Sequence, residues 1–463
     1  MKDILNKKEC GWKNIDENKK NEVLAFSDSY IGFLNSSKTE REANKSIIKE
    51  LEQNGFTNIN DTDSLNVGDK IYFNNRGKSV FAAIIGKNNI EKGLNIIGAH
   101  IDSPRLDLKP NPVYEDAKLA LFKTHYYGGI KKYQWTTIPL AIHGVVVKPS
   151  GDKIEINIGE DENDPIFTIT DILPHLAQKQ YEKKIGEAIE GESLNLLIGS
   201  IPSNDSDSVK ENVLQILNEK YDISEIDFYS SELEVVPAFN ARSLGFDKSM
   251  VAGYGQDDKV CAYATLEAII DCDTFDYTNV AIFADKEEIG SVGNTGMYSE
   301  MFDNFVNMLL DKTNTNAPSA LNRTYCNSRM LSADVGSGID PNYQDVSEVN
   351  NASHIGYGVE LNKYTGARGK SGANDANAEF VAYVRDVFET NNVKYQVSEL
   401  GKVDIGGGGT IAYILANKGI DVLDCGVPVI SMHSPYEVTS KYDIYCAYLG
   451  YKAFFESSKK VNY

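Results

Sequence analysis

The sequence predicts an α/β protein whose main sheet is mainly parallel and carries helices on both faces. Short apolar runs alternate with helical segments in two regions of the chain, and several of those runs end at an acidic residue or a histidine. A stretch of different character separates the two regions. We therefore divide the 463 residues into a main domain, 1–103 and 238–463, and an inserted, smaller, β-rich domain, 104–237.

The first region begins with helices and continues with strands. Apolar residues at helical spacing predict a helix over 18–35, and Thr39 with Glu42 shows the capping-box pattern that opens a second helix. Two β-rich runs follow at 79–85 and 94–99. These segments predict that the main sheet starts near the amino terminus.

The inserted domain is predicted from a hairpin and a lack of strand-to-acid junctions. The runs 138–148 and 153–158 are joined by a turn-type segment, Pro149–Asp152. Helical segments are expected at 173–189 and 208–220. Insertions of this kind are tolerated in exposed loops of a stable sheet.

The last region returns to alternating strands and helices. An alanine-rich helix is expected over 258–271 and a buried strand over 279–284. The remaining elements are expected as strands at 330–333, 422–423 and 429–432 and as helices at 373–390 and 410–416.

Composition narrows the class of function. Lys plus Arg is 46 and Asp plus Glu is 67, so the net charge of −21 disfavours a nucleic-acid partner. The six cysteines form no C-x-x-C pair, which argues against a Cys-ligated zinc site and suits a reducing cytoplasm. No apolar run approaches a membrane span, and Met1–Glu9 lacks the apolar core of a secretory signal. We expect a cytoplasmic protein with no membrane partner.

Metal-binding residue types stand at the ends of the short strands. They are His100, the adjacent Glu287 and Glu288, Asp334 and His433, and Asp257 opens the alanine-rich helix. Each has a structural alternative: a satisfied histidine, a solvated acidic loop, a turn residue or a helix cap. Their common position at strand ends favours a metal site instead. One of the two adjacent glutamates could bind a metal while its neighbour faces a water or substrate. The two histidines and the other three carboxylates suit two zinc ions that share one carboxylate and leave a position for water.

Asp102 follows His100 by two residues and is a candidate to orient the imidazole ring. A carboxylate on the second ring nitrogen fixes the tautomer of a liganding histidine. This contact requires the chain to stay extended through Ile101.

These residues lie in motifs that resemble the aspartyl aminopeptidase family of di-zinc exopeptidases, in its bacterial form. The motifs occur in family order nearly end to end, at Gly98–Pro104, Leu173–Leu176, Gly255–Asp258, Asp285–Ser291, Ser332–Asp334, Pro341–Tyr343 and Met432–Ser434. The resemblance implies a zinc exopeptidase-like fold, peptide substrates and removal of amino-terminal residues. It also implies a homo-oligomer, a dodecamer, in which the inserted domain makes dimer contacts.

The resemblance also implies a role for each site residue. Asp257 would bridge two zinc ions, His100 and Asp334 would complete one ion, and Glu288 and His433 would complete the other. Glu287 would be the general base and Asp102 would orient His100, and the bond from Asp257 to Asp258 would be cis. Co²⁺ or Mn²⁺ would substitute for zinc, because their affinities for such sites overlap.

Two positions depart from the family pattern. Glu360 stands where acidic-specific members carry a lysine, so a pocket that it lines would favour basic or neutral first residues. Alternatively, Glu360 faces solvent. His175 keeps a family position that contributes to a substrate site, but Lys179 replaces a second histidine, and core packing is the alternative for His175.

Three other interpretations remain open at this stage. The metal set would also serve another co-catalytic zinc hydrolase, such as a deacylase or carboxypeptidase, or a catalytically silent, zinc-stabilised assembly protein. The segment Ile405–Thr410 resembles a phosphate-binding turn but lacks the spacing of G-x-G-x-x-G and a Walker lysine. We expect its glycines to let the backbone approach the amino end of the substrate or to begin a helix.

Overall fold

The computed structural model describes residue 4 and residues 8–315 and 317–463, and it divides into two compact units. The first unit comprises Met1–Asp102, Ala241–Met432 and Tyr436–Tyr463. The second comprises Ser103–Asn240 and His433–Pro435.

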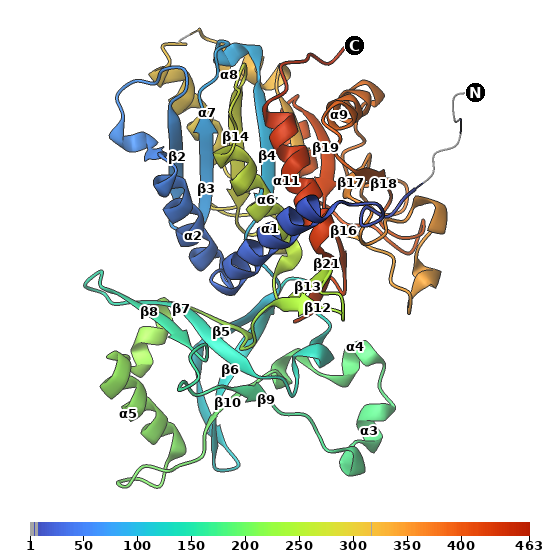
Figure 1. Cartoon of the computed structure of the whole chain (residues 1–463). Coiled ribbons are helices and arrows are strands. Elements are labelled where there is room, and N and C mark those ends of the chain that lie inside the picture. Colours follow the sequence, from blue (N-terminus) through green and yellow to red (C-terminus); the bar gives the residue numbers. More distant parts are fainter. Residues whose placement is uncertain (1–3, 5–7, 316) are drawn as a thin grey trace. The chain divides into compact units, whose positions relative to one another are not determined.

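A nine-stranded sheet forms the centre of the first unit (Figure 1). Its four neighbouring strands β14, β4, β15 and β19 are parallel, and antiparallel pairs flank them. The strands in sheet order are β1 Thr57–Asn58, β2 Lys70–Asn75, β3 Ser79–Ile84, β14 Thr278–Ala284, β4 Leu94–His100, β15 Arg329–Ser332, β19 Asp421–Gly426, β17 Val359–Asn362 and β18 Tyr395–Val397. The predicted mixed α/β class is confirmed.

Helices cover both faces of this sheet. Successive residues of β4 point to opposite faces, so Ile97 packs in one core cluster and Ile96 in the other. Burial on both faces explains why the central strands are continuous apolar runs. Helices α1 Glu17–Asn35, α2 Glu40–Gln53, α6 Gln256–Ile270, α9 Ala378–Thr390 and α11 Lys441–Phe455 supply the first cluster, and α7 Met301–Lys312, α8 Ala320–Cys326 and α10 Ala412–Ala416 supply the second.

A five-stranded sheet in the same unit corrects one expectation. The strand that precedes His433 is β20, Pro428–Ile430, and it pairs with β21, Glu437–Ser440, rather than joining the main sheet. Ser431 has a positive φ of 60°, which ends the strand earlier than predicted. The other strands of this sheet are β12 Arg242–Leu244, β13 Met250–Gly253 and β16 Gly336–Ser337.

The second unit is built on a seven-stranded antiparallel sheet. The predicted hairpin is confirmed as β7 and β8, which pair from Ile142 with Ile158 to Val147 with Lys153. The strands in sheet order are β8 Lys153–Ile158, β7 Leu140–Val147, β11 Ser231–Pro237, β5 Arg105–Asp116, β6 Leu119–Tyr127, β10 Leu196–Gly199 and β9 Thr168–Ile169. Only two of the seven strands were predicted.

Predicted helices differ in length from those observed. The expected helix over 173–189 is instead three short pieces: a 3-10 turn at Pro174–Leu176, α3 Gln178–Tyr181 and α4 Ile185–Ala188. The helix expected at 208–220 is α5, Val209–Tyr221. The capping box of α2 is present, with the Glu42 N–H donating to Thr39 Oγ1 and the Thr39 N–H donating to Glu42 Oε2. No helix within the described ranges is long and apolar enough to cross a membrane.

Candidate metal centre

The carboxyl ends of three neighbouring strands bring the first-unit candidates together. β4 lies between β14 and β15, and all three run parallel, so their last residues reach one edge of the sheet. His100 is the last residue of β4 and pairs with Ala284, the last residue of β14. Asp334 follows β15 by two residues. The register of these strands therefore brings together candidate ligands that are far apart in the sequence.

His100 is the centre of the cluster. Its Nε2 lies 3.2 Å from Asp257 Oδ1, 3.8 Å from Asp334 Oδ1 and 4.0 Å from Glu287 Oε2. Two groups of residues could each hold a metal ion, because the ligand atoms inside each group all lie within 4.8 Å of one another. The first group is His100, Asp257 and Glu288, and the second is His100, Asp258 and Asp334. His100 belongs to both groups, so one imidazole joins them.

Asp102 contacts both His100 and the acidic pair. The Oδ1 of Asp102 lies 3.3 Å from His100 Nδ1, and the Asp102 carbonyl oxygen lies 3.0 Å from the same nitrogen. The chain stays extended here, since the Ile101 N–H donates to the Ala284 carbonyl at 2.8 Å. The Asp102 carboxylate also accepts the backbone N–H groups of Glu287 at 3.1 Å and Glu288 at 3.2 Å. It therefore fixes the imidazole and the two glutamates relative to one another.

The start of α6 holds Asp257 in the cluster. The bond from Asp257 to Asp258 is cis, and the Asp257 N–H donates to Glu437 Oε2 at 3.1 Å. Asp258 is fully buried, and its Oδ2 accepts a hydrogen bond from the backbone N–H of His100 at 3.2 Å. Our sequence reasoning assigned no role to Asp258 or Glu437. For Asp258, the only local signal was the pair of adjacent acids at 257–258. Glu437 gave no local signal, because it is 180 residues from Asp257 in the sequence.

Several buried carboxylates lie close together at this edge of the sheet. Burial raises the pKa of Asp334 and of Asp258 above the ordinary range, and neighbouring carboxylates raise both further. Burial alone would lower the pKa of His100, but the hydrogen bonds with Asp102 and Asp257 and the charges of Asp102 and Asp334 together outweigh it and raise that pKa. Carboxylates gathered out of water around one imidazole form a site that a cation stabilises. Imidazole nitrogen and carboxylate oxygen are ligands that zinc accepts, so these residues fit the metal.

A short loop after β14 carries Glu287 and Glu288. Lys286 has a left-handed φ of 67°, which turns the chain sharply at the strand end. Thr295 Oγ1 donates to the buried Asp285 Oδ2 at 2.5 Å and accepts from Lys286 Nζ at 2.9 Å. The loop is therefore closed by side chains on either side of the acidic pair.

His433 belongs to the second compact unit. Its φ is 64°, and its Nδ1 lies 2.8 Å from the Gly129 carbonyl oxygen. In the tautomer that donates this hydrogen bond, Nε2 carries the lone pair that a metal would use. Its role as a zinc ligand stays a prediction.

The structure rules out one alternative each for His175 and Glu360. His175 lies exposed on the 3-10 turn Pro174–Leu176, so the core-packing alternative is wrong. Glu360 lies in β17 with 1% of its surface exposed, so the solvent-facing alternative is wrong. The Glu360 carboxylate accepts a hydrogen bond from Asn362 Nδ2 at 2.9 Å, and burial raises its pKa. Its predicted contact with the first residue of a substrate stays a prediction.

The glycine-rich segment near β19 packs against its own chain. A Cβ at Gly407 would lie 2.4 Å from the Ala367 Cα, and one at Gly406 would lie 2.3 Å from the Leu400 carbonyl oxygen. Thr410, which ends the segment, donates its hydroxyl to the buried Asp424 at 2.6 Å. The glycines permit close backbone approach, and the neighbour they admit is another loop of the protein. The predicted approach to the amino end of the substrate stays a prediction.

The sheet, the helices on both faces and the ligand cluster at the carboxyl edge define a zinc exopeptidase-type α/β protein. A family model described as Aminopeptidase I zinc metalloprotease (M18) matches residues 33–455. The chain belongs to this M18 family, and it is a metallo-aminopeptidase, a hydrolase. The expected family is confirmed at the level of M18, whereas the aspartyl specificity is not part of what the match states.

Three relatives give the extent of the similarity. The probable M18 family aminopeptidase 1 of Clostridium acetobutylicum is 52% identical over 459 residues, 98% of this chain and 99% of that one. The crystal structure of the M18 aminopeptidase of Thermotoga maritima has a TM-score of 0.94 at 45% identity and covers 98% of this chain and 100% of its own. The mApe1 dodecamer of S. cerevisiae has a TM-score of 0.75 at 21% identity, covering 95% and 97%, and shows likeness of fold alone.

Proposed function

We propose that the protein removes amino-terminal residues from peptides with two zinc ions in each subunit. The observation that carries this proposal is the position of Glu287, whose Oε2 lies 4.0 Å from His100 Nε2 beside two overlapping groups of ligand atoms. A structural zinc site needs no second carboxylate at its edge, whereas hydrolysis needs a base there. This argues against the alternative of a silent assembly protein.

We assign the ligands as the motifs imply. Asp257 would bridge the two ions, with His100 and Asp334 on one and Glu288 and His433 on the other. When bound, zinc polarises the peptide carbonyl and lowers the pKa of water. Co²⁺ or Mn²⁺ would substitute, because carboxylate and imidazole ligands accept all three ions.

Glu287 acts as the general base. It takes a proton from the attacking water and then delivers that proton to the leaving amine. Asp102 holds the backbone at Glu287 and the ring of His100 at once, so it keeps the base at a fixed distance from the ligands. Glu287 must stay free of the metal, since a carboxylate bound to zinc has little basicity left.

The same ligands would serve a deacylase or a carboxypeptidase, so the substrate must be tested directly. Aminoacyl p-nitroanilides, N-acetylated amino acids and peptides with a blocked amino terminus separate the three activities. We expect turnover of the first class only, lost on chelation and restored by Zn²⁺, Co²⁺ or Mn²⁺. Turnover confined to blocked peptides or acetylated amino acids would reject the aminopeptidase proposal.

For the first residue, we propose a preference for basic or neutral side chains over acidic ones. This preference is inferred because position 360 is a glutamate, whereas members of the aspartyl aminopeptidase family that prefer acidic residues carry a lysine there. An Asp side chain would find no counter-charge from that position, and the buried Glu360 carboxylate would add repulsion when ionised. Rates on Asp-, Lys- and Leu-terminated substrates decide the matter, and a clear preference for Asp would refute the proposal.

We also propose a homo-oligomer, a dodecamer as in the yeast relative, with contacts through the inserted unit, 104–237. That unit exposes large apolar side chains on its short helices, including Leu176 at 67%, Tyr181 at 70% and Ile185 at 71%. His175 stands in the same exposed stretch and would reach a neighbouring subunit's substrate site in such an assembly. Light scattering on wild type and on a Leu176→Glu, Ile185→Glu variant tests this, and an unchanged mass would reject these contacts.

A further inference from the structure

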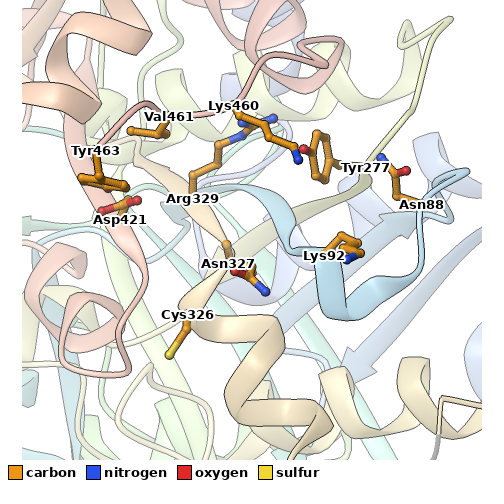
Figure 2. Close-up of a pocket in the computed structure, with 11 residues that line it drawn as sticks. Asn88, Lys92, Tyr277, Cys326, Asn327, Arg329, Asp421, Lys460, Val461 and Tyr463 are labelled. Carbon is orange, nitrogen blue, oxygen red and sulfur yellow. The ribbon is translucent and has the colours of Figure 1, made fainter.

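The first unit has a cavity of about 470 Å³ at the edge of the sheet opposite the metal centre. Its walls come from the amino-terminal ends of the parallel strands, whereas the metal candidates follow their carboxyl ends. Figure 2 shows the lining, with Asp421 and Tyr463 on one side and Asn88 and Lys92 on the other. The cavity is therefore separate from the site already described.

Arg329, the first residue of β15, is the buried cation of this cavity. Only 5% of its surface is exposed, and its guanidinium lies 4.6 Å from the ring centre of Tyr277 and 4.7 Å from that of Tyr383. Stacking between two rings fixes the plane of a guanidinium and its N–H directions.

The hydrogen bonds of Arg329 go to neutral acceptors. Nε donates to Asn95 Oδ1 at 2.7 Å, Nη2 donates to the Ser457 carbonyl at 3.0 Å, and Nη1 donates to the Lys459 carbonyl. A guanidinium has five N–H donors, so two remain beyond these three bonds. Among the residues that the structure describes, no carboxylate lies within the 4.0 Å of an ion pair with Arg329. A charge taken out of water without such a partner is stabilised by an anionic ligand.

The rim of the cavity adds positive charge. Lys92 and Lys460 are exposed and line it, and Asp421 is the one acidic side chain among the lining residues. The Tyr463 hydroxyl donates a hydrogen bond to Asp421. Three cationic side chains and one acidic side chain line the cavity, in a chain whose net charge is −21. The local field therefore attracts small anions that the rest of the surface repels.

We propose that this cavity binds a small anion bearing phosphate or carboxylate groups, held by Arg329 from below and by Lys92 and Lys460 at the rim. Planar, fixed N–H donors suit the oxygen pairs of both groups, and the two lysines supply charge without fixed geometry. The volume matches that of small-ligand sites. The alternative is a structural role alone, in which Arg329 holds Asn95 and the backbone carbonyls of Ser457 and Lys459.

The test is calorimetric titration of the zinc-loaded protein with inorganic phosphate, with citrate and with chloride at constant ionic strength. Phosphate can also bind zinc, so the decisive comparison is between variants. Lys92→Glu with Lys460→Glu changes the rim, and Lys13→Glu with Lys45→Glu, both exposed and outside the cavity lining, makes the same change in net charge elsewhere.

We expect phosphate or citrate to bind wild type and the control pair with a dissociation constant of about 1 mM or below, and chloride not to compete. The rim variant should bind at least about tenfold more weakly. Loss with phosphate alone identifies a phosphate site, and loss with citrate alone a carboxylate site. Equal binding by the rim variant and the control pair, or no binding of either anion by wild type, would overturn the proposal.

Discussion

The carboxylate of Asp102 accepts the backbone N–H of Glu287 at 3.1 Å. The same Oδ1 lies 3.3 Å from His100 Nδ1, so one side chain braces a proposed ligand and the proposed base. Removing the Asp102 carboxylate should therefore lower both the affinity for zinc and the turnover rate.

We expect Asp102→Asn to bind zinc about 10- to 100-fold more weakly and to lower kcat even at saturating zinc. The amide presents one oxygen where the carboxylate offers two, so a backbone N–H at 287 or 288 loses its acceptor. Zinc affinity is measured by competition with a chelator and kcat on a Leu p-nitroanilide. Weaker zinc binding with full kcat at saturation would restrict Asp102 to orienting His100.

Glu287→Gln should leave zinc content near normal while kcat falls by about 10² or more, the scale of general-base catalysis. Glutamine keeps the shape of the side chain and removes the proton acceptor. Glu288→Gln is the matched neighbour, because its position in the ligand-atom group predicts a loss of zinc as well as of turnover. A Glu287→Gln enzyme with near wild-type kcat would reject the assignment of the base.

The position of the candidates at strand ends explains how far the sequence could predict the site. His100 and Asp334 follow buried parallel strands whose apolar runs are visible locally, and the register of those strands brings them together. Asp258, Glu437 and Thr295 were not predicted, because their contacts depend on where α6, β21 and the loop after β14 meet the sheet.

The inserted unit was predicted less completely for a similar reason. Strand β5, Arg105–Asp116, contains two prolines and several charged residues. It forms a hairpin with β6 and pairs on its other side with β11, more than 100 residues later. Its half-exposed pattern gives little periodic signal, and its turn to β6, Ala117–Lys118, lacks the glycine or asparagine that usually marks such a turn. The pairing with β11 is chosen by tertiary packing. The β7–β8 hairpin was predictable because its turn, Pro149–Asp152, contains proline and glycine.

Thr295→Val should lower kcat by about tenfold with little change in KM, because the loop that carries Glu287 loses its closure. Valine keeps the volume but removes the donor to Asp285 and the acceptor for Lys286. Leaving the buried Asp285 oxygen without this hydroxyl should also cost about 1–3 kcal/mol of stability. Thr295→Ser restores the hydroxyl and should restore kcat. Failure of serine to rescue would indicate that the methyl group, not the hydrogen bond, holds the loop.

Asp443 should make stability depend on pH in a defined window. It is fully buried in α11 and accepts the Gly356 N–H at 2.6 Å and the Gly358 N–H at 2.7 Å. Burial raises its pKa to about 8, whereas an unfolded Asp titrates at about 3.9. Below about pH 4 both states hold the proton. Between about pH 4 and 8 the unfolded state alone loses it, so stability falls as pH rises and levels off above about 8.

Asp443→Asn removes this titration. It should be less stable than wild type at low pH, because its side-chain NH₂ group faces one of the two glycine N–H groups and cannot accept a hydrogen bond from it. The difference in Tm between wild type and variant should then shrink steadily from about pH 5 to about pH 8, since only wild type loses stability through this group. Asp63→Asn, an exposed substitution in the same unit, controls for general charge effects and should show no such trend. A wild-type advantage that stays constant over this range would mean that Asp443 is ionised in the folded protein throughout, with the two glycine N–H groups outweighing its burial.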